Sequence, residues 1–357
     1  MGFLILSIYP MATSTSFALF DDGAEIKRAE LRFEPYGISE TGETCEQFSA
    51  HEAYAEYAIT EWLREIRPPD IIIAGAFPRS QFPTGIYVIN DDFKKRLCGN
   101  YPFSRIINRG SVLASRIARR VSACPISLVT VSNHEVDAIY KISGIRGMTF
   151  NGLTRMMRMR EAICTLSGKM GALREKCSVI AAYLDDGFSI CSQSKGRIRD
   201  FSDPFERGAF SVKYTGSLSA ISVIRMAYSG KWSKADLLKT IYESGGLSSY
   251  FPGAGLNEVI AMMRDGDAYA SMVLRAMIGQ LAAEFSAHAA ALYGRVDAFV
   301  LMGEYAMNEF FVSLLRDKIS WICDKIMIYK GIDELNILAQ AAGEFLKGRN
   351  APAVSGL

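Results

Sequence analysis

The sequence is poor in histidine and carries almost no net charge. Its 357 residues include three histidines, and 40 Lys and Arg stand against 38 Asp and Glu, which gives a formal net charge of +2. Such a balance gives no electrostatic reason to expect a nucleic acid partner, and no basic block with interleaved aromatic residues is present. The three histidines are scattered, without the ligand spacing of a metal site. His51 and His288 lie on predicted helical faces and are interpreted as surface or core-packing residues, and His134 lies in a predicted loop.

Long apolar runs and a regular cysteine pattern are also missing. No stretch approaches the roughly 20 apolar residues that a membrane helix needs. The N-terminal run Phe3–Ile8 has no positive charge before it and is interrupted by Pro10, so we interpret it as a core strand and expect no membrane association. The seven cysteines are odd in number and scattered. This pattern favours reduced core thiols in a cytoplasmic protein over disulfides.

Two similar segments lie about half a chain apart. Residues 3–33 contain an apolar run, a hydroxyl cluster, a second apolar run and then Asp21-Asp22-Gly23, which has the glycine of a tight hairpin. Residues 177–201 repeat this order around Asp185-Asp186-Gly187. Each segment predicts three antiparallel strands, and the repeat indicates a duplicated domain, with two unrelated meanders as the alternative. A chain of this length is expected to form two α/β domains, at 1–150 and 151–330, and a closing helix at 331–348 could pack back on the first.

The hydrophobic pattern predicts helices over most of the remaining chain. The helical segments are 49–67, 105–121, 150–169, 219–228, 234–243, 257–265, 268–292, 309–319 and 334–346. Residues 268–292 are strongly apolar on one side, so this helix should be central. In the basic helix 105–121 we expect the arginines, among them Arg109 and Arg116, to face solvent. Short apolar strands are expected at 70–74, 125–131, 295–301 and 325–329.

Several segments of the chain resemble one known family. They are ISG at 142–144, KGRIRD at 195–200, ERG at 206–208, YSGKWSKADLLKTIYESGGLSSYF at 228–251, GRVDAFVLMGE at 294–304 and IYKGIDELNILAQAAGEFLKG at 328–348. They are similar to the corresponding segments of butyrate kinases, in the acetate kinase family. The resemblance implies two duplicated ribonuclease-H-like domains of the actin-like ATPase fold with an interdomain cleft. It also implies transfer of the γ-phosphoryl group of ATP to a short-chain carboxylic acid, with Mg²⁺ as cofactor, in a protein that is commonly a homo-oligomer.

The resemblance also implies roles for particular residues. Arg207 would contact the transferring phosphoryl group, and Arg79 would be a second cation in the site. The residues expected to bind nucleotide are Thr13, Ser14, Thr15, Asp186, Gly187, Gly303 and Glu304. Glu334 and Asp185 would hold the metal.

The chain departs from the family at its phosphate loops. The first reads Tyr9 to Ser16 where butyrate kinases have roughly Asn-Pro-Gly-Ser-Thr-Ser-Thr-Lys, and the second has Asp185-Asp186-Gly187 where they have three glycines. Two carboxylates there would repel a triphosphate unless a metal lies between them. Two hypotheses follow, a divergent carboxylate kinase and a catalytically inactive relative with a binding or assembly role. A sugar kinase or ATPase of the same fold is a third.

Overall fold

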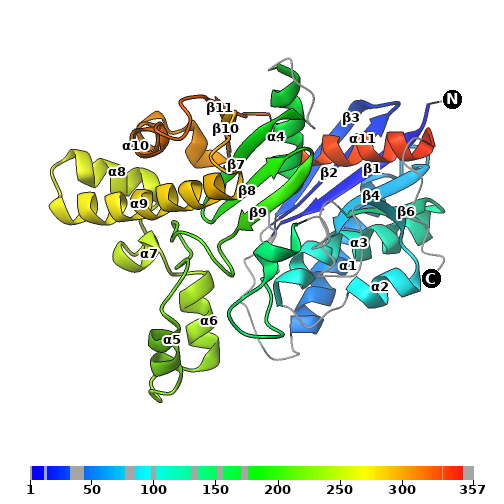
Figure 1. Cartoon of the computed structure of the whole chain (residues 1–357). Coiled ribbons are helices and arrows are strands. Elements are labelled where there is room, and N and C mark those ends of the chain that lie inside the picture. Colours follow the sequence, from blue (N-terminus) through cyan, green and yellow to red (C-terminus); the bar gives the residue numbers. More distant parts are fainter. Residues whose placement is uncertain are drawn as a thin grey trace. The chain divides into compact units, whose positions relative to one another are not determined.

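The computed structural model describes residues 2–11, 14–32, 44–76, 85–97, 102–129, 136–150, 156–169, 176–331 and 333–348. The chain divides into two compact units, Met1–Glu135 with Asp333–Leu357, and Val136–Ile332. Each unit contains one mixed sheet with helices packed on it (Figure 1). This confirms the predicted α/β class.

The first unit is built on a six-stranded sheet in the order β3-β2-β1-β4-β6-β5. Its strands are β1 (Leu4–Pro10), β2 (Ser14–Asp21), β3 (Ala24–Arg32), β4 (Ile71–Ala76), β5 (Gly85–Val88) and β6 (Cys124–Val129). Its helices are α1 (Thr44–Trp62), α2 (Asp91–Leu97), α3 (Pro102–Val121) and α11 (Glu334–Leu346). The predicted meander is present as β1, β2 and β3, and β1 then pairs in parallel with β4. Residues Leu4–Ile8 are all buried, as expected where helices cover both faces of a sheet.

The second unit repeats this topology in a five-stranded sheet, β11-β10-β7-β8-β9. Its strands are β7 (Ser178–Leu184), β8 (Phe188–Ser194), β9 (Arg197–Ser202), β10 (Ala298–Met302) and β11 (Ile326–Ile328). Its helices are η1 (Ala138–Lys141), α4 (Met156–Lys169), α5 (Ala220–Ala227), α6 (Lys234–Tyr242), α7 (Leu247–Tyr250), α8 (Leu256–Arg264), α9 (Ala268–Ala291), η3 (Glu304–Met307) and α10 (Glu309–Ile319). In both units an antiparallel meander is followed by parallel strands on its inner edge. The predicted duplication is therefore confirmed at the level of strand order.

Helix α9 organises the core of the second unit, as its apolar pattern predicts. Asp267 begins the helix by accepting hydrogen bonds from the backbone N–H groups of Tyr269 and Ala270 at 2.8 and 3.0 Å. Its buried residues follow the helical period and pack against β7, β8 and β9 (Figure 1). Leu281 and Phe285 are completely buried there.

The expectation that the arginines of α3 face solvent is wrong for the inner side of this helix. Arg109 is 2% exposed, and Arg116 donates to the buried Glu56 of α1 at 2.7 Å. Arg120 also pairs with Glu56. A buried carboxylate needs cationic partners, so α1 and α3 are joined by charges as well as by apolar contacts. Glu52 lies beside them, and burial raises the pKa of this carboxyl while Arg109 and Arg116 oppose that shift.

Among the described cysteines none forms a disulfide, which fits the predicted free thiols. Cys177 and Cys191 are buried as expected, but Cys124 and Cys164 are exposed, so not all of them are core residues. Within the described residues, no helix is long and apolar enough to cross a bilayer.

Candidate functional site

The second hairpin turn, Asp185-Asp186-Gly187, lies where β7 ends, beside the end of the parallel strand β10. The carboxylate of Asp186 accepts hydrogen bonds from Lys213 Nζ at 2.5 Å and from the hydroxyl of Tyr305 at 3.1 Å. Its backbone carbonyl accepts from Ser211 Oγ at 2.7 Å and from the backbone N–H of Lys213 at 3.1 Å. The turn is thus fixed to the segment after β9, and Lys213 offsets the negative charge of Asp186.

Asp185 has a different environment. Its carboxylate accepts from the hydroxyl of Tyr183 and from the backbone N–H of Asp186, both at 2.9 Å. Arg158 of α4 donates to the same tyrosine hydroxyl, and its guanidinium lies 4.9 Å from the centre of the Tyr183 ring. The described partners that bond to Asp185 directly are neutral, so this carboxylate keeps more negative charge available than Asp186 does.

These contacts show which of the two aspartates is the better candidate for a metal ligand. Among the described residues no three His, Cys, Asp or Glu side chains lie close enough to form a metal site. Mg²⁺ in kinases is commonly bound by one or two carboxylates together with phosphate oxygens and water, so such a cluster is not required. Asp185 fits that requirement better than Asp186, whose carboxylate is already paired with an ammonium group.

Two glycines make the close backbone approaches at this edge. Gly303 follows β10 with φ at +95°, and a Cβ placed on it would lie 2.4 Å from the carbonyl oxygen of Leu184. At Gly187 a Cβ would lie 2.9 Å from Pro204 Cγ. Glycine is therefore required at 303 both by the backbone conformation and by space. Glu304, the next residue, is exposed and begins η3.

Arg207 lies in the loop that follows β9. Its guanidinium stands between the rings of Phe150 and Phe201, at 5.0 and 5.1 Å from their centres. Nη2 donates to the carboxylate of Asp200 and to the carbonyl of Phe201. The side chain is 27% exposed. Its position is thus fixed by two rings, a carboxylate and a carbonyl, while part of the cation stays accessible.

The Asp203 loop is held by a buried acid. Oδ1 of Asp203 accepts from the backbone N–H groups of Phe205 and Glu206 at 2.9 and 3.0 Å, and the residue is 1% exposed. Burial is the main cause that raises the pKa of this carboxyl to about 7, partly opposed by those two hydrogen bonds. Asp203 also donates its backbone N–H to the carbonyl of Arg207 at 2.9 Å, so it shapes the loop that presents the arginine.

The remaining expected site residues belong to the first unit. Ser14 and Thr15 begin β2 and are buried, and a hydrogen bond with Ser14 is the main cause that lowers the pKa of Glu30. Glu334 is the first residue of α11, after the capping residue Asp333. Thr13, Arg79 and His134 lie outside the described residues.

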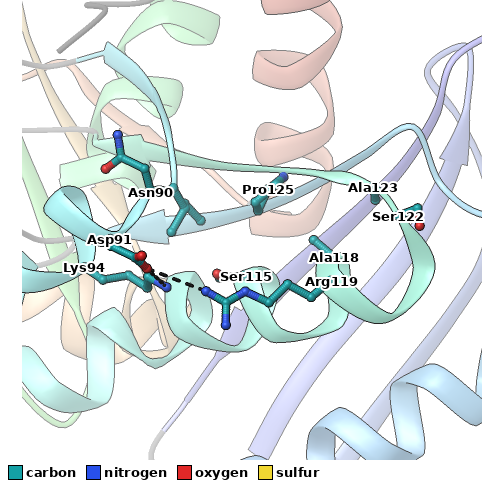
Figure 2. A pocket seen from close by; sticks show the side chains of 10 residues that line it. Asn90, Asp91, Lys94, Ser115, Ala118, Arg119, Ser122, Ala123 and Pro125 are labelled. Carbon is teal, nitrogen blue, oxygen red and sulfur yellow. Dashed lines mark ion pairs between the residues drawn. The ribbon is translucent and has the colours of Figure 1, made fainter. Parts of the chain in front are cut away.

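A hollow of about 490 Å³ lies elsewhere in the first unit, beside α3 and the start of β6 (Figure 2). Its polar wall includes Asp91, which pairs with Lys94 at 2.6 Å and with Arg119 at 3.6 Å. Ligands of open α/β sheets bind at the carboxyl ends of the parallel strands, whereas this hollow adjoins Pro125, near the amino end of β6. We therefore do not assign it to the candidate site.

Four residues complete the site and were not identified as site residues from the sequence: Lys213, Tyr305, Asp200 and Asp203. They are single polar residues without a motif, and only folding brings them to Asp186 and Arg207. Asp200 and Asp203 lie within or beside segments used for the family resemblance, KGRIRD and ERG, and that proximity is the one signal that could have drawn attention to them.

Comparisons with known proteins address the family. No family model matches the chain. The chain is 28% identical over 363 residues to "Probable butyrate kinase 2" of Caldanaerobacter subterraneus subsp. tengcongensis, and the match covers 99% of this chain and 100% of the relative. Its structure is similar to that of acetate kinase from Porphyromonas gingivalis, with a TM-score of 0.77, 12% identity, and 96% and 100% of the two chains covered. Acetate kinase from Entamoeba histolytica gives a TM-score of 0.79 at 13% identity, with 96% and 99% covered.

The protein thus has the duplicated actin-like fold that acetate kinases have. Within that fold class it is a homologue of butyrate kinase, related over its whole length. The resemblance found in the sequence is confirmed.

Proposed function

We propose that the protein is an ATP-dependent carboxylate kinase that forms an acyl phosphate from a short-chain carboxylic acid, with butyrate as the first acid to test. The observation that carries the proposal is Arg207. It is a partly exposed cation held by the rings of Phe150 and Phe201, in the loop whose Pro204 lies against Gly187 of the hairpin turn. The whole-length similarity to a probable butyrate kinase supports it.

The proposed reaction places modest demands on the protein. A carboxylic acid with a pKa near 4 to 5 is already ionised at neutral pH, so no general base is needed. One oxygen of the acceptor carboxylate bonds to the γ-phosphorus as the bond from that phosphorus to the bridging oxygen breaks, and ADP leaves. The protein must hold the two reactants in line and neutralise the charge on the transferring group.

We assign these tasks as follows. Arg207, with Arg79, neutralises the transferring group. Main-chain N–H groups and hydroxyls at Thr13, Ser14, Thr15 and Gly187 receive phosphate, and the glycines at 187 and 303 allow the nucleotide to approach the backbone. Asp185 and Glu334 would hold Mg²⁺ directly or through water, and the ion would supply positive charge to the phosphate groups.

The Asp186–Lys213 pair makes this assignment electrostatically acceptable. Two unpaired carboxylates would repel a triphosphate, but Lys213 is bound to Asp186. We further propose that Asp186 and Glu304 contact polar groups of the nucleotide. We also propose that the enzyme works in the cytoplasm as a homo-oligomer.

A second candidate function, a catalytically inactive relative, is favoured by one specific feature. The backbone N–H of Asp186 already donates to the Asp185 carboxylate, and Nη2 of Arg207 already donates to Asp200. Two groups that would meet phosphate in a kinase are thus bound to carboxylates of the chain itself. If these contacts persist in the presence of nucleotide, the fold would serve binding or assembly instead.

The two functions are separated by trapping acyl phosphates as hydroxamates, with MgATP and a panel of short-chain acids. For the kinase we expect turnover that Arg207→Ala lowers by about 10²–10³-fold, the typical cost of removing one charge-stabilising group. Arg225→Ala is the matched control, because Arg225 is exposed on α5, and its turnover should equal that of the unchanged protein. Absence of turnover with every acid, together with no nucleotide binding by calorimetry, would favour the inactive relative.

A further inference from the structure

A buried polar chain lies behind Arg207, between α9 and the last two strands of the meander. At its centre is His288 of α9, which is 1% exposed. Its Nδ1 lies 3.3 Å from Ser192 Oγ on β8, and its Nε2 lies 3.1 Å from Ser202 Oγ on β9. Both serines are also buried, so the imidazole is held on both sides by buried hydroxyl groups.

The direction of each hydrogen bond follows from the donors that are already in use. Ser202 Oγ donates its proton to the carboxylate of Glu284, which can only accept, so it acts as the acceptor towards His288 Nε2. Ser192 Oγ accepts the backbone N–H of Asp200 at 3.2 Å and donates to His288 Nδ1. A neutral imidazole carries one proton, which must then be on Nε2 and point to Ser202 Oγ.

The charge of His288 agrees with this assignment. Burial, and secondly the positive charge of Arg207, lower the pKa of the imidazole to about 3, so it is neutral at physiological pH. The register of β8 and β9 shifts between Ser192 and Gln193, and this irregularity falls at the residue that reaches His288. Irregularities of this kind often redirect one side chain.

The hydrogen-bonded series Ser192–His288–Ser202 ends on both sides at an acid that interacts with Arg207. At one end Asp200, whose backbone N–H is held by Ser192, accepts from Nη2 of Arg207. At the other end is Glu284, whose pKa is raised mainly by burial and lowered in part by the charge of Arg207. A single imidazole therefore links the acid that pairs with this guanidinium, Asp200, to a second acid, Glu284, that feels its charge.

We propose that His288 is a positioning residue. As a neutral imidazole protonated on Nε2, it fixes the positions of Asp200 and Glu284 through Ser192 and Ser202, and in this way it fixes the guanidinium of Arg207. The inference rests on the proposed function only in that Arg207 is there taken to contact the transferring phosphoryl group. The hydrogen-bond chain itself is independent of catalysis and is tested separately.

The first test is the tautomer, read by ¹⁵N NMR of the full-length protein labelled at histidine, with a His288→Gln sample to assign the signal. We expect a neutral ring with its proton on Nε2 at neutral pH. A ring protonated on Nδ1, or a charged ring, would overturn the assignment.

The second test is the effect on Arg207, whose Nε is buried and has no hydrogen-bond partner among the described residues. Its N–H should therefore exchange slowly with water. We expect His288→Met to increase this exchange rate at least about tenfold, and His288→Gln, which restores one donor, to recover part of the protection. Ser286→Ala is the matched control on the same helix, because Ser286 bonds only to its own helix at Ala282 O, at 2.9 Å.

Turnover gives the third readout. His288→Met should lower kcat about tenfold with KM for MgATP nearly unchanged, because the cation is misplaced while the nucleotide contacts remain. If His288→Met does not fold, Ser202→Ala breaks the chain at its other link and should act in the same way. Arg207 exchange that is equal in all variants would refute the positioning role. Protection that depends on His288 in a protein without turnover would support the role and refute only the proposed function.

Discussion

Replacement of Gly303 by alanine tests how the ends of β7 and β10 are joined. The new Cβ would stand 2.4 Å from the Leu184 carbonyl oxygen, and the residue has φ +95° and ψ 174°, a region that alanine avoids. Holding alanine there costs about 1–3 kcal/mol. Relief of the clash with a backbone atom adds about 1–3 kcal/mol. We expect the free energy of unfolding to fall by about 2–6 kcal/mol.

Gly266→Ala is the matched control for this experiment. Gly266 has φ +94°, but a Cβ there would meet nothing within 4 Å. Alanine at this position should therefore pay only the backbone cost, about 1–2 kcal/mol. Urea unfolding followed by far-UV circular dichroism measures both variants. Equal losses of stability would show that the approach of residue 303 to Leu184 is not as close as the structure has it.

Three further predictions concern buried ionisable groups. Glu56→Gln should lower the free energy of unfolding by about 1–2 kcal/mol, measured by urea unfolding, because Arg116 and Arg120 lose their shared carboxylate but, being 40% and 61% exposed, stay solvated; no loss at all would contradict the pairing. Asp203 has a pKa of about 7 in the folded protein against an ordinary 3.8, so the folded state keeps a proton that the unfolded chain releases, and stability falls as pH rises between these values. Asp203→Asn should remove this decrease in the free energy of unfolding with pH, measured by urea unfolding at a series of pH values. An unchanged pH dependence would contradict the raised pKa of Asp203. Burial raises the pKa of the Cys191 thiol to about 12, so alkylation detected by mass spectrometry should reach Cys191 only after unfolding, while the exposed Cys164 reacts in the native protein.

Regular elements with a clear hydrophobic period could be predicted from the sequence. Helices α9 and α10 and the two meanders agree with expectation to within a few residues, because burial on one face requires a matching pattern. Strand β5 and helix α2 were missed. They are short, and their pattern is too brief to separate from a loop.

The polar interior could not be predicted in the same way. Arg109 and His288 are buried beside partners from distant segments, Glu52 and the two serines, and no local pattern encodes those partners. A lone histidine on a helix predicts surface exposure or core packing, and it gives no indication of the serines that His288 contacts. The family resemblance indicated Arg207, whereas its contacts with Asp200, Phe150 and Phe201 required the fold.

The central claim, that the protein is a working carboxylate kinase, is tested most directly by running the proposed reaction in reverse. The protein is mixed with ADP, Mg²⁺ and butyryl phosphate, and ATP is measured by luminescence. The account predicts ATP formation that is lost in Arg207→Ala and kept in Arg225→Ala. No ATP from this or any other short-chain acyl phosphate, with a folded protein, would contradict the claim and leave the fold without its reaction.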